Sequence, residues 1–146
     1  MKVKIEIEEN CQECQVIIIN HAMDSEVEEI VRKLKETFPQ VLTGIINDTL
    51  EIINPETIIR VYAQNGKVYV SSTKGEYLLR LRLYEVGERL DSQLFVRISH
   101  SEIVNLKMIE NFDLSFAGTI GVSLSHGVKT YVSRRYVKSI KNILGI

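Results

Sequence analysis

The chain contains 146 residues, of which 45% are hydrophobic and 25% are charged, and these values exclude disordered and collagen-like classes. Its net charge of −1 conceals an asymmetry, because residues 1–57 carry 5 Lys or Arg and 12 Asp or Glu, whereas residues 58–146 carry 13 and 7. We therefore expect only the C-terminal part to bind a polyanion, the alternative being a basic helix face in water.

The sequence carries no membrane-spanning or export signal. Its longest apolar stretch, Val16–Ile19, has the size of a strand and is far shorter than a membrane span. The N-terminus alternates charged and β-branched residues and lacks the apolar core of a signal peptide. We expect a cytoplasmic protein with enough residues to build a sizeable core.

Two segments near the N-terminus predict strands, Lys2–Glu8 by strict alternation and Val16–Ile19 by its apolar run. Cys11 and Cys14 lie between them, in a spacing that can hold a metal or form a redox pair. A zinc site needs two further ligands, and the three histidines are scattered singly along the chain. We therefore favour two reduced thiols and expect no metal site and no cofactor.

The clearest helix is predicted over Asp24–Phe38, whose apolar residues recur with helical spacing. Ser25 and Glu28 have the spacing of a capping box at its start. Pro39 and Gly44 then mark a turn region. We interpret residues 1–43 as a β-β-α segment that serves for dimerisation or for sensing a partner.

Residues 44–146 predict a mainly β domain of antiparallel strands with short helices. Turn signals such as Asn47-Asp48, Asn54-Pro55 and the glycine turn in AQNGK separate short apolar runs. A short amphipathic helix is expected at Leu83–Leu90. The expected strands are Gly44–Ile46, Thr49–Ile53, Ile58–Tyr62, Val68–Ser72, Glu76–Leu81, Lys107–Asp113, Thr119–Ser125 and Lys129–Val132.

Two further blocks carry the functional signal. FVRISHSEIVNL, from Phe95 to Leu106, predicts a strand that leads into a polar loop, with room for one helical turn. YVSRRYVKSIKNIL, from Tyr131 to Leu144, predicts a strand that ends at an N-cap serine, followed by a helix. Two arginines in the first turn of this helix would oppose its dipole, so they indicate an anion site unless both point into water.

These two blocks closely resemble the LytTR family of DNA-binding domains. IIRVYAQNGKVYV and LYEVGERL match the family's early strand–loop–strand and its short helix, and the four blocks occur in the family's order over residues 44–144. The resemblance implies a mostly β transcription regulator whose loops enter the major groove. The sequence predicts no helix-turn-helix, because no two amphipathic helices are joined by a short turn.

The resemblance also assigns the residues that contact DNA. The resemblance implies that the loop residues Ser99, His100 and Ser101 approach the bases. Many family members have the histidine one position earlier, so the base preference of the family cannot be carried over to this chain. It implies a base contact for Arg135, while Lys138 is placed for the phosphate backbone, and Arg134 either binds phosphate or is left free. The third contact is the early loop with Gln64, Asn65 and Lys67. Asn105 matches a position that is usually Asn in the family, and it is expected to hold a turn through side-chain bonds to the backbone.

We therefore expect a sequence-specific regulator of duplex DNA that acts as a homodimer on direct repeats. The N-terminal segment is too short for a phosphoacceptor receiver domain. Regulators of this compact type resemble systems paired with a small membrane protein, which suggests such a partner. No catalytic motif occurs, so we expect no enzyme. The alternative is an adaptor or inhibitor that kept the fold and lost DNA binding.

Overall fold

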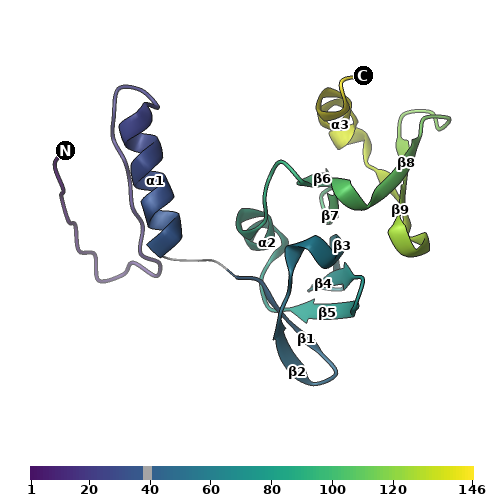
Figure 1. The fold of residues 1–146 in the computed structure, drawn as a ribbon, viewed down its shortest axis with the longest axis horizontal. Coiled ribbons are helices and arrows are strands. Elements are labelled where there is room, and N and C mark those ends of the chain that lie inside the picture. The colour runs from purple at the N-terminus through teal and green to yellow at the C-terminus, as the bar shows by residue number, and fades with distance from the viewer. Residues whose placement is uncertain (38–40) are drawn as a thin grey trace. The chain divides into compact units, whose positions relative to one another are not determined.

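The computed structural model describes residues 1–37 and 41–146, which fold as two compact units divided between residues 39 and 40. In the N-terminal unit, helix α1 (Ser25–Thr37) forms as predicted. Phe38 and Pro39 lie outside the described residues. The two strands expected at 2–8 and 16–19 do not form, and residues 1–24 contain no strand (Figure 1). A strand requires a hydrogen-bonded neighbour, and this segment has none within its own unit.

Asp24, not Ser25, caps the N-terminus of α1. Its Oδ1 accepts a hydrogen bond from the backbone N–H of Val27 at 3.0 Å, and its Oδ2 accepts one from the Asn20 side chain at 3.0 Å. These bonds to the carboxylate, the Val27 bond foremost, lower the pKa of Asp24. The predicted capping box at Ser25 and Glu28 is therefore wrong by one position.

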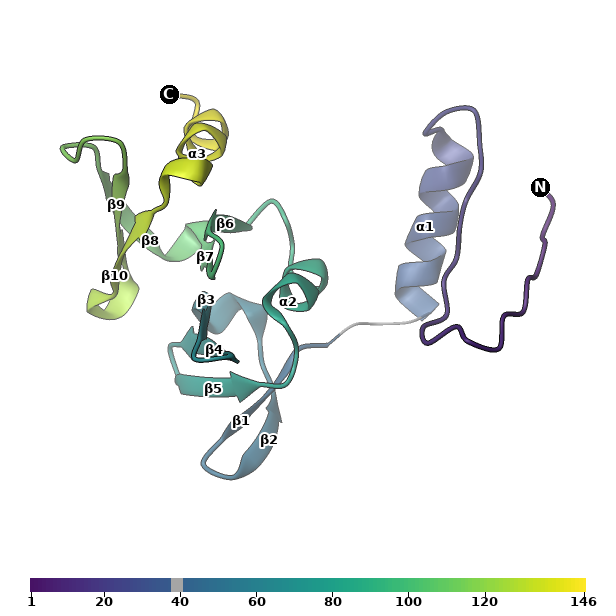
Figure 2. The ribbon, with the colours of Figure 1, turned by 180° about the vertical axis from the view of Figure 1, so that it is seen from behind.

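The C-terminal unit contains a seven-stranded and a three-stranded sheet, both antiparallel, with strand orders β2-β1-β5-β4-β3-β7-β6 and β10-β9-β8. This confirms the mainly β prediction (Figure 1, Figure 2). The elements are β1 (Thr43–Ile46), β2 (Thr49–Ile52), β3 (Ile58–Gln64), β4 (Lys67–Ser72), β5 (Gly75–Leu79), α2 (Leu83–Arg89), β6 (Phe95–Ser99), β7 (Glu102–Asn105), β8 (Ile109–Asp113), β9 (Ile120–Leu124), β10 (Lys129–Val132) and α3 (Val137–Leu144).

The sequence did not predict strand β7. The segment after the polar loop returns as a strand and pairs with both β6 and β3, so the loop is the turn of a hairpin. All four residues of β7 are buried, which removes the alternation that identifies a half-exposed strand. The segment expected as one strand from Lys107 begins instead with a 3₁₀ turn, Leu106–Met108.

The seven-stranded sheet separates two hydrophobic clusters. One lies with α2 and includes Val61, Val86 and Ile103, and the other lies with the three-stranded sheet and α3. The second cluster includes Val104, next to Ile103 on β7, so the central strands are buried on both faces. A slip by one residue would move each side chain of these strands into the other cluster, so the close packing of both clusters opposes it.

Asn105 joins β7 to the start of β3. It is 3% exposed; its Nδ2 donates to the Ile58 carbonyl at 2.8 Å, and its Oδ1 accepts from the backbone N–H of Lys107 at 3.0 Å. The second bond caps the 3₁₀ turn after β7. The prediction that Asn105 holds a turn is confirmed.

Replacing Asn105 with alanine should lower the free energy of unfolding by roughly 1–3 kcal/mol, because the buried Ile58 carbonyl and the Lys107 N–H lose their partner. Urea denaturation measures the change. Asn111→Ala, at an exposed position of β8, is the matched control and should leave stability within about 0.5 kcal/mol. Equal stability of the two variants would contradict the structural role of Asn105.

Candidate nucleic-acid interface

Two backbone hydrogen bonds bring together the three segments predicted to contact DNA. The Ala63 N–H donates to the Ser101 carbonyl at 2.8 Å, which joins the β3–β4 turn to the β6–β7 turn. The Ser133 N–H donates to the Ile98 carbonyl at 2.8 Å, which joins the β6–β7 turn to the segment that enters α3. Segments more than 30 residues apart in sequence therefore begin at one edge of the unit.

The β3–β4 turn has the geometry that its Asn-Gly dipeptide favours. Asn65 and Gly66 have φ values of 52° and 76°, as a two-residue hairpin turn requires. Gln64 pairs with Lys67 across the turn, and the side chains of Gln64, Asn65 and Lys67 are all exposed. This turn presents one cation and two amides to solvent.

The β6–β7 turn is held by its own side chains. The Arg97 Nη1 donates to the His100 carbonyl at 2.7 Å, and the Ser101 N–H donates to the Ser99 Oγ at 3.2 Å. Ser99 is half-buried and serves the turn, whereas His100 and Ser101 are exposed. The sequence did not predict the turn contact of Arg97, because this residue lies on strand β6 and not in the turn itself.

The two arginines precede α3 and do not occupy its first turn. They lie in a 3₁₀ turn, Arg134–Tyr136, and α3 begins at Val137. The side chain of Ser133 makes no capping hydrogen bond, so its predicted role as a side-chain N-cap is wrong. Opposition to the dipole of α3 is therefore weaker than the sequence suggested, because the effect is confined to the first turn of the helix itself.

Arg134 and Arg135 lie in different surroundings. A Cβ added to Gly118, in the β8–β9 loop, would lie 3.4 Å from the Arg134 Nε, so this guanidinium packs beside that loop. Arg135 and Lys138 are exposed and make no ion pair with any residue that the structure describes. Both have charges that are available to an external anion.

A partly buried ion pair lies behind the β6–β7 turn. Glu102 Oε2 is 3.0 Å from the Arg60 Nη1, and Glu102 Oε1 accepts a hydrogen bond of 2.6 Å from the Thr130 hydroxyl. The Arg60 guanidinium also lies 4.4 Å from the ring centroid of Tyr62. The network links β3, β7 and β10, and therefore the two sheets. It also neutralises the carboxylate that directly follows Ser101.

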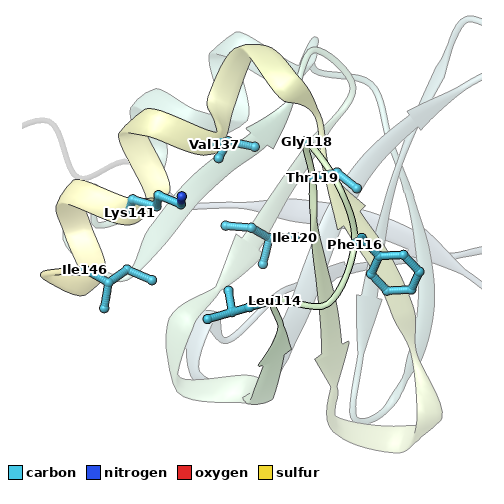
Figure 3. Close-up of a pocket in the computed structure, with 8 residues that line it drawn as sticks. All are labelled: Leu114, Phe116, Gly118, Thr119, Ile120, Val137, Lys141 and Ile146. Carbon is cyan, nitrogen blue, oxygen red and sulfur yellow. The ribbon is translucent and has the colours of Figure 1, made fainter.

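A hollow of about 320 Å³ lies between the β8–β9 loop and α3 (Figure 3). Its lining is mainly apolar, with one charged residue, Lys141. Val137 and Ile120 face it from α3 and β9, and Phe116 lies on the loop side.

The N-terminal cysteines form no metal site with their neighbours. Cys11 and Cys14 are exposed free thiols, and no group of three or more His, Cys, Asp or Glu side chains occurs in residues 1–37 and 41–146 that could hold a metal ion. Within the same ranges, no helix is long and apolar enough to cross a membrane.

Arg80 is a further exposed cation at the same end of the sheet, which the sequence did not single out. It directly follows β5, whose Leu79 pairs with Val68 beside the β3–β4 turn, and it is exposed. Only the sheet register shows this position, because Leu79, which precedes Arg80, pairs with Val68, which follows Lys67. Among the predicted residues, eight are exposed and only Ser99 is half-buried.

The fold and this surface define a β-rich module that presents loops and a helix start, with exposed cations, along one edge. The family model of the LytTr DNA-binding domain matches residues 48–145. The chain belongs to the LytTR family of DNA-binding transcriptional regulators.

Relatives extend the match to the N-terminal unit. A protein named as an uncharacterised HTH-type transcriptional regulator, from Staphylococcus aureus strain NCTC 8325, is 36% identical and covers 100% of this chain and 99% of its own length. Its counterpart in strain MRSA252 is 35% identical over the same shares. A solved LytTr DNA-binding domain from Bacillus cereus has a TM-score of 0.69 and 24% identity over 73% of this chain and 97% of its own, which shows the shared fold.

Replacing Glu102 with alanine should destabilise the protein by about 2 kcal/mol or more, because Arg60 keeps a largely buried charge without its partner. Thermal or urea unfolding measures the loss. Glu110→Ala, an exposed glutamate on β8, is the matched control. A Glu102→Ala protein as stable as the control would show that the ion pair does not hold the two sheets together.

Proposed function

We propose that this chain recognises specific duplex DNA sequences in the major groove through Gln64–Lys67, Ser99–Ser101 and Arg134–Lys138. The observation that carries the proposal is the pair of backbone hydrogen bonds, Ala63 to Ser101 and Ser133 to Ile98. Because these bonds are part of the packed unit, the three segments reach a ligand as one prearranged surface. Prearrangement lowers the ordering cost of binding.

The side chains on this surface suit the two kinds of DNA contact. Arg135 can donate two hydrogen bonds to guanine O6 and N7, and His100 can donate to or accept from several base edges. Lys138 and Arg134 suit phosphate contacts, which set the position of the protein but carry little sequence information. Gln64 and Asn65 offer amides, which can pair with adenine N6 and N7.

Two copies on adjacent direct repeats would raise specificity, since one small module makes few base contacts. A homodimer is therefore part of the proposal, and a small membrane protein is proposed as the regulator of its activity. The protein acts by binding and catalyses no reaction.

The competing function is that of an adaptor which kept the fold without DNA binding. An acidic neighbourhood around the two arginines would favour it. Neither Arg134 nor Arg135 forms an ion pair with a carboxylate in the described residues. The charges therefore favour a polyanion over this alternative.

Selection of bound duplexes from a random pool should yield an enriched, repeated motif. Arg135→Ala should weaken binding to that motif by about 1–3 kcal/mol and reduce discrimination at one base position, because the guanidinium contributes base readout. Titration of motif variants at fixed salt measures both effects. Lys74→Ala, in the β4–β5 turn at the other end of the sheet, is the control and should bind as wild type.

Lys138→Ala should instead weaken binding to all duplexes to a similar degree. The slope of log K against log salt should fall by about one, as expected for one lost phosphate contact. Binding measured between about 50 and 200 mM salt gives the slope. If no sequence is enriched and the two variants bind like Lys74→Ala, the proposal fails and the adaptor function gains support.

A further inference from the structure

The N-terminal segment exposes an unusual amount of apolar surface. Val3, Ile5 and Ile7 are 79%, 77% and 86% exposed, while Val27 is the buried hydrophobic residue of this unit in the part that the structure describes. Exposed apolar residues that alternate along a segment are typical of an interface, because isolated chains rarely leave such surface in water. The segment Lys2–Glu8 is therefore a candidate surface for binding another protein chain.

The backbone of residues 2–7 makes no hydrogen bond with the residues that the structure describes, and at the end of the segment the Glu8 carbonyl accepts one from the Cys11 N–H at 3.1 Å. The segment forms no strand and runs apart from α1 within its own unit (Figure 1, Figure 2). The Lys4 Nζ is 2.9 Å from the Glu6 Oε1, an i,i+2 pair that puts both charges on the same side of the backbone. This arrangement is that of a strand, with charges on one face and apolar residues on the other. Unpaired N–H and C=O groups along such a segment are a template for another strand.

We propose that residues 2–8 of two copies of this chain pair as antiparallel strands about a two-fold axis at Ile5. The pattern of charges carries this proposal, since among antiparallel registers with a two-fold axis only this one places every charged residue opposite a residue of the other sign. The paired residues are Lys2 opposite Glu8, Val3 opposite Ile7, Lys4 opposite Glu6, and Ile5 opposite its own copy.

Other registers fail on charge or on pattern. A slip by two residues puts Lys4 opposite Lys4 or Glu6 opposite Glu6 at the axis, and like charges directly opposite are destabilising. A slip by one residue places charged side chains against apolar ones. Parallel pairing in register brings every charge beside its own copy. The antiparallel register at Ile5 avoids all three conflicts.

The paired segments form an isologous interface, as most homodimers use. The axis gathers Lys4 and Glu6 from both strands into a cluster of alternating charges. The apolar face of the ribbon needs cover, because two strands alone are marginally stable. Val16, Ile17 and Ile19 are 64%, 77% and 92% exposed in the same unit and can provide that cover. The proposal gives the expected homodimer a defined surface, which lies outside the DNA-binding unit.

Charge reversal tests the pairing in the full chain, without DNA. Lys4→Glu places four glutamates around the axis and Glu6→Lys places four lysines, so each variant alone should dimerise roughly tenfold or more weakly than wild type. An equimolar mixture of the two variants should recover the wild-type dimerisation constant as a heterodimer, because each copy then supplies the opposite charge. The double variant with both reversals should also dimerise as wild type.

Sedimentation equilibrium gives the constants, and native mass spectrometry with one isotopically labelled variant identifies the heterodimer. Glu13→Lys, an exposed reversal outside the segment, is the matched control and should dimerise as wild type. The proposal is overturned by a monomeric wild type, by single variants that dimerise normally, or by a mixture that shows no recovery. In each case duplex binding by the C-terminal unit can still be measured separately, so failure here is distinguishable from failure of the proposed DNA function.

Discussion

The hydrogen bond from the Ser133 N–H to the Ile98 carbonyl determines how the proposed recognition surface is assembled. It joins the two sheets at the core. Ile98, which accepts the bond, and Val132, which precedes the donor Ser133, are both 0% exposed. Buried backbone groups must be paired, so this contact cannot be given up without a large loss of stability. The position of the segment before α3 is therefore set by the core, and the turn after Ile98 moves with it.

The unit separates buried charge from exposed charge. Glu102, directly after the β6–β7 turn, is paired with Arg60 and hydrogen-bonded to Thr130, so its negative charge is compensated inside the protein. Arg135 and Lys138 remain exposed at the same edge. The result is a surface with available cations and a neutralised acid behind it, which suits a polyanionic ligand.

Local sequence signals predicted most elements of the C-terminal unit, because residues such as Asn47, Asp48 and Gly66 tolerate the positive φ values that their turns require. Strand β7 was missed because burial on both faces removes alternation. The turn contact of Arg97 and the position of Arg80 depend on turn geometry and register, which a linear pattern does not contain. In the N-terminal unit, alternation over residues 2–8 predicted a strand that does not form, because a strand also needs a hydrogen-bonded neighbour and the described residues of that unit supply none.

The most direct measurement of the recognition surface is the change in backbone amide NMR shifts when the selected duplex is added. Joint shifts at residues 64–67, 99–101 and 134–138 at one stoichiometry, with the β4–β5 turn around Lys74 unchanged, are expected if the three segments bind as one surface. Shifts confined to one segment, or to the N-terminal unit, would contradict a recognition surface built from all three.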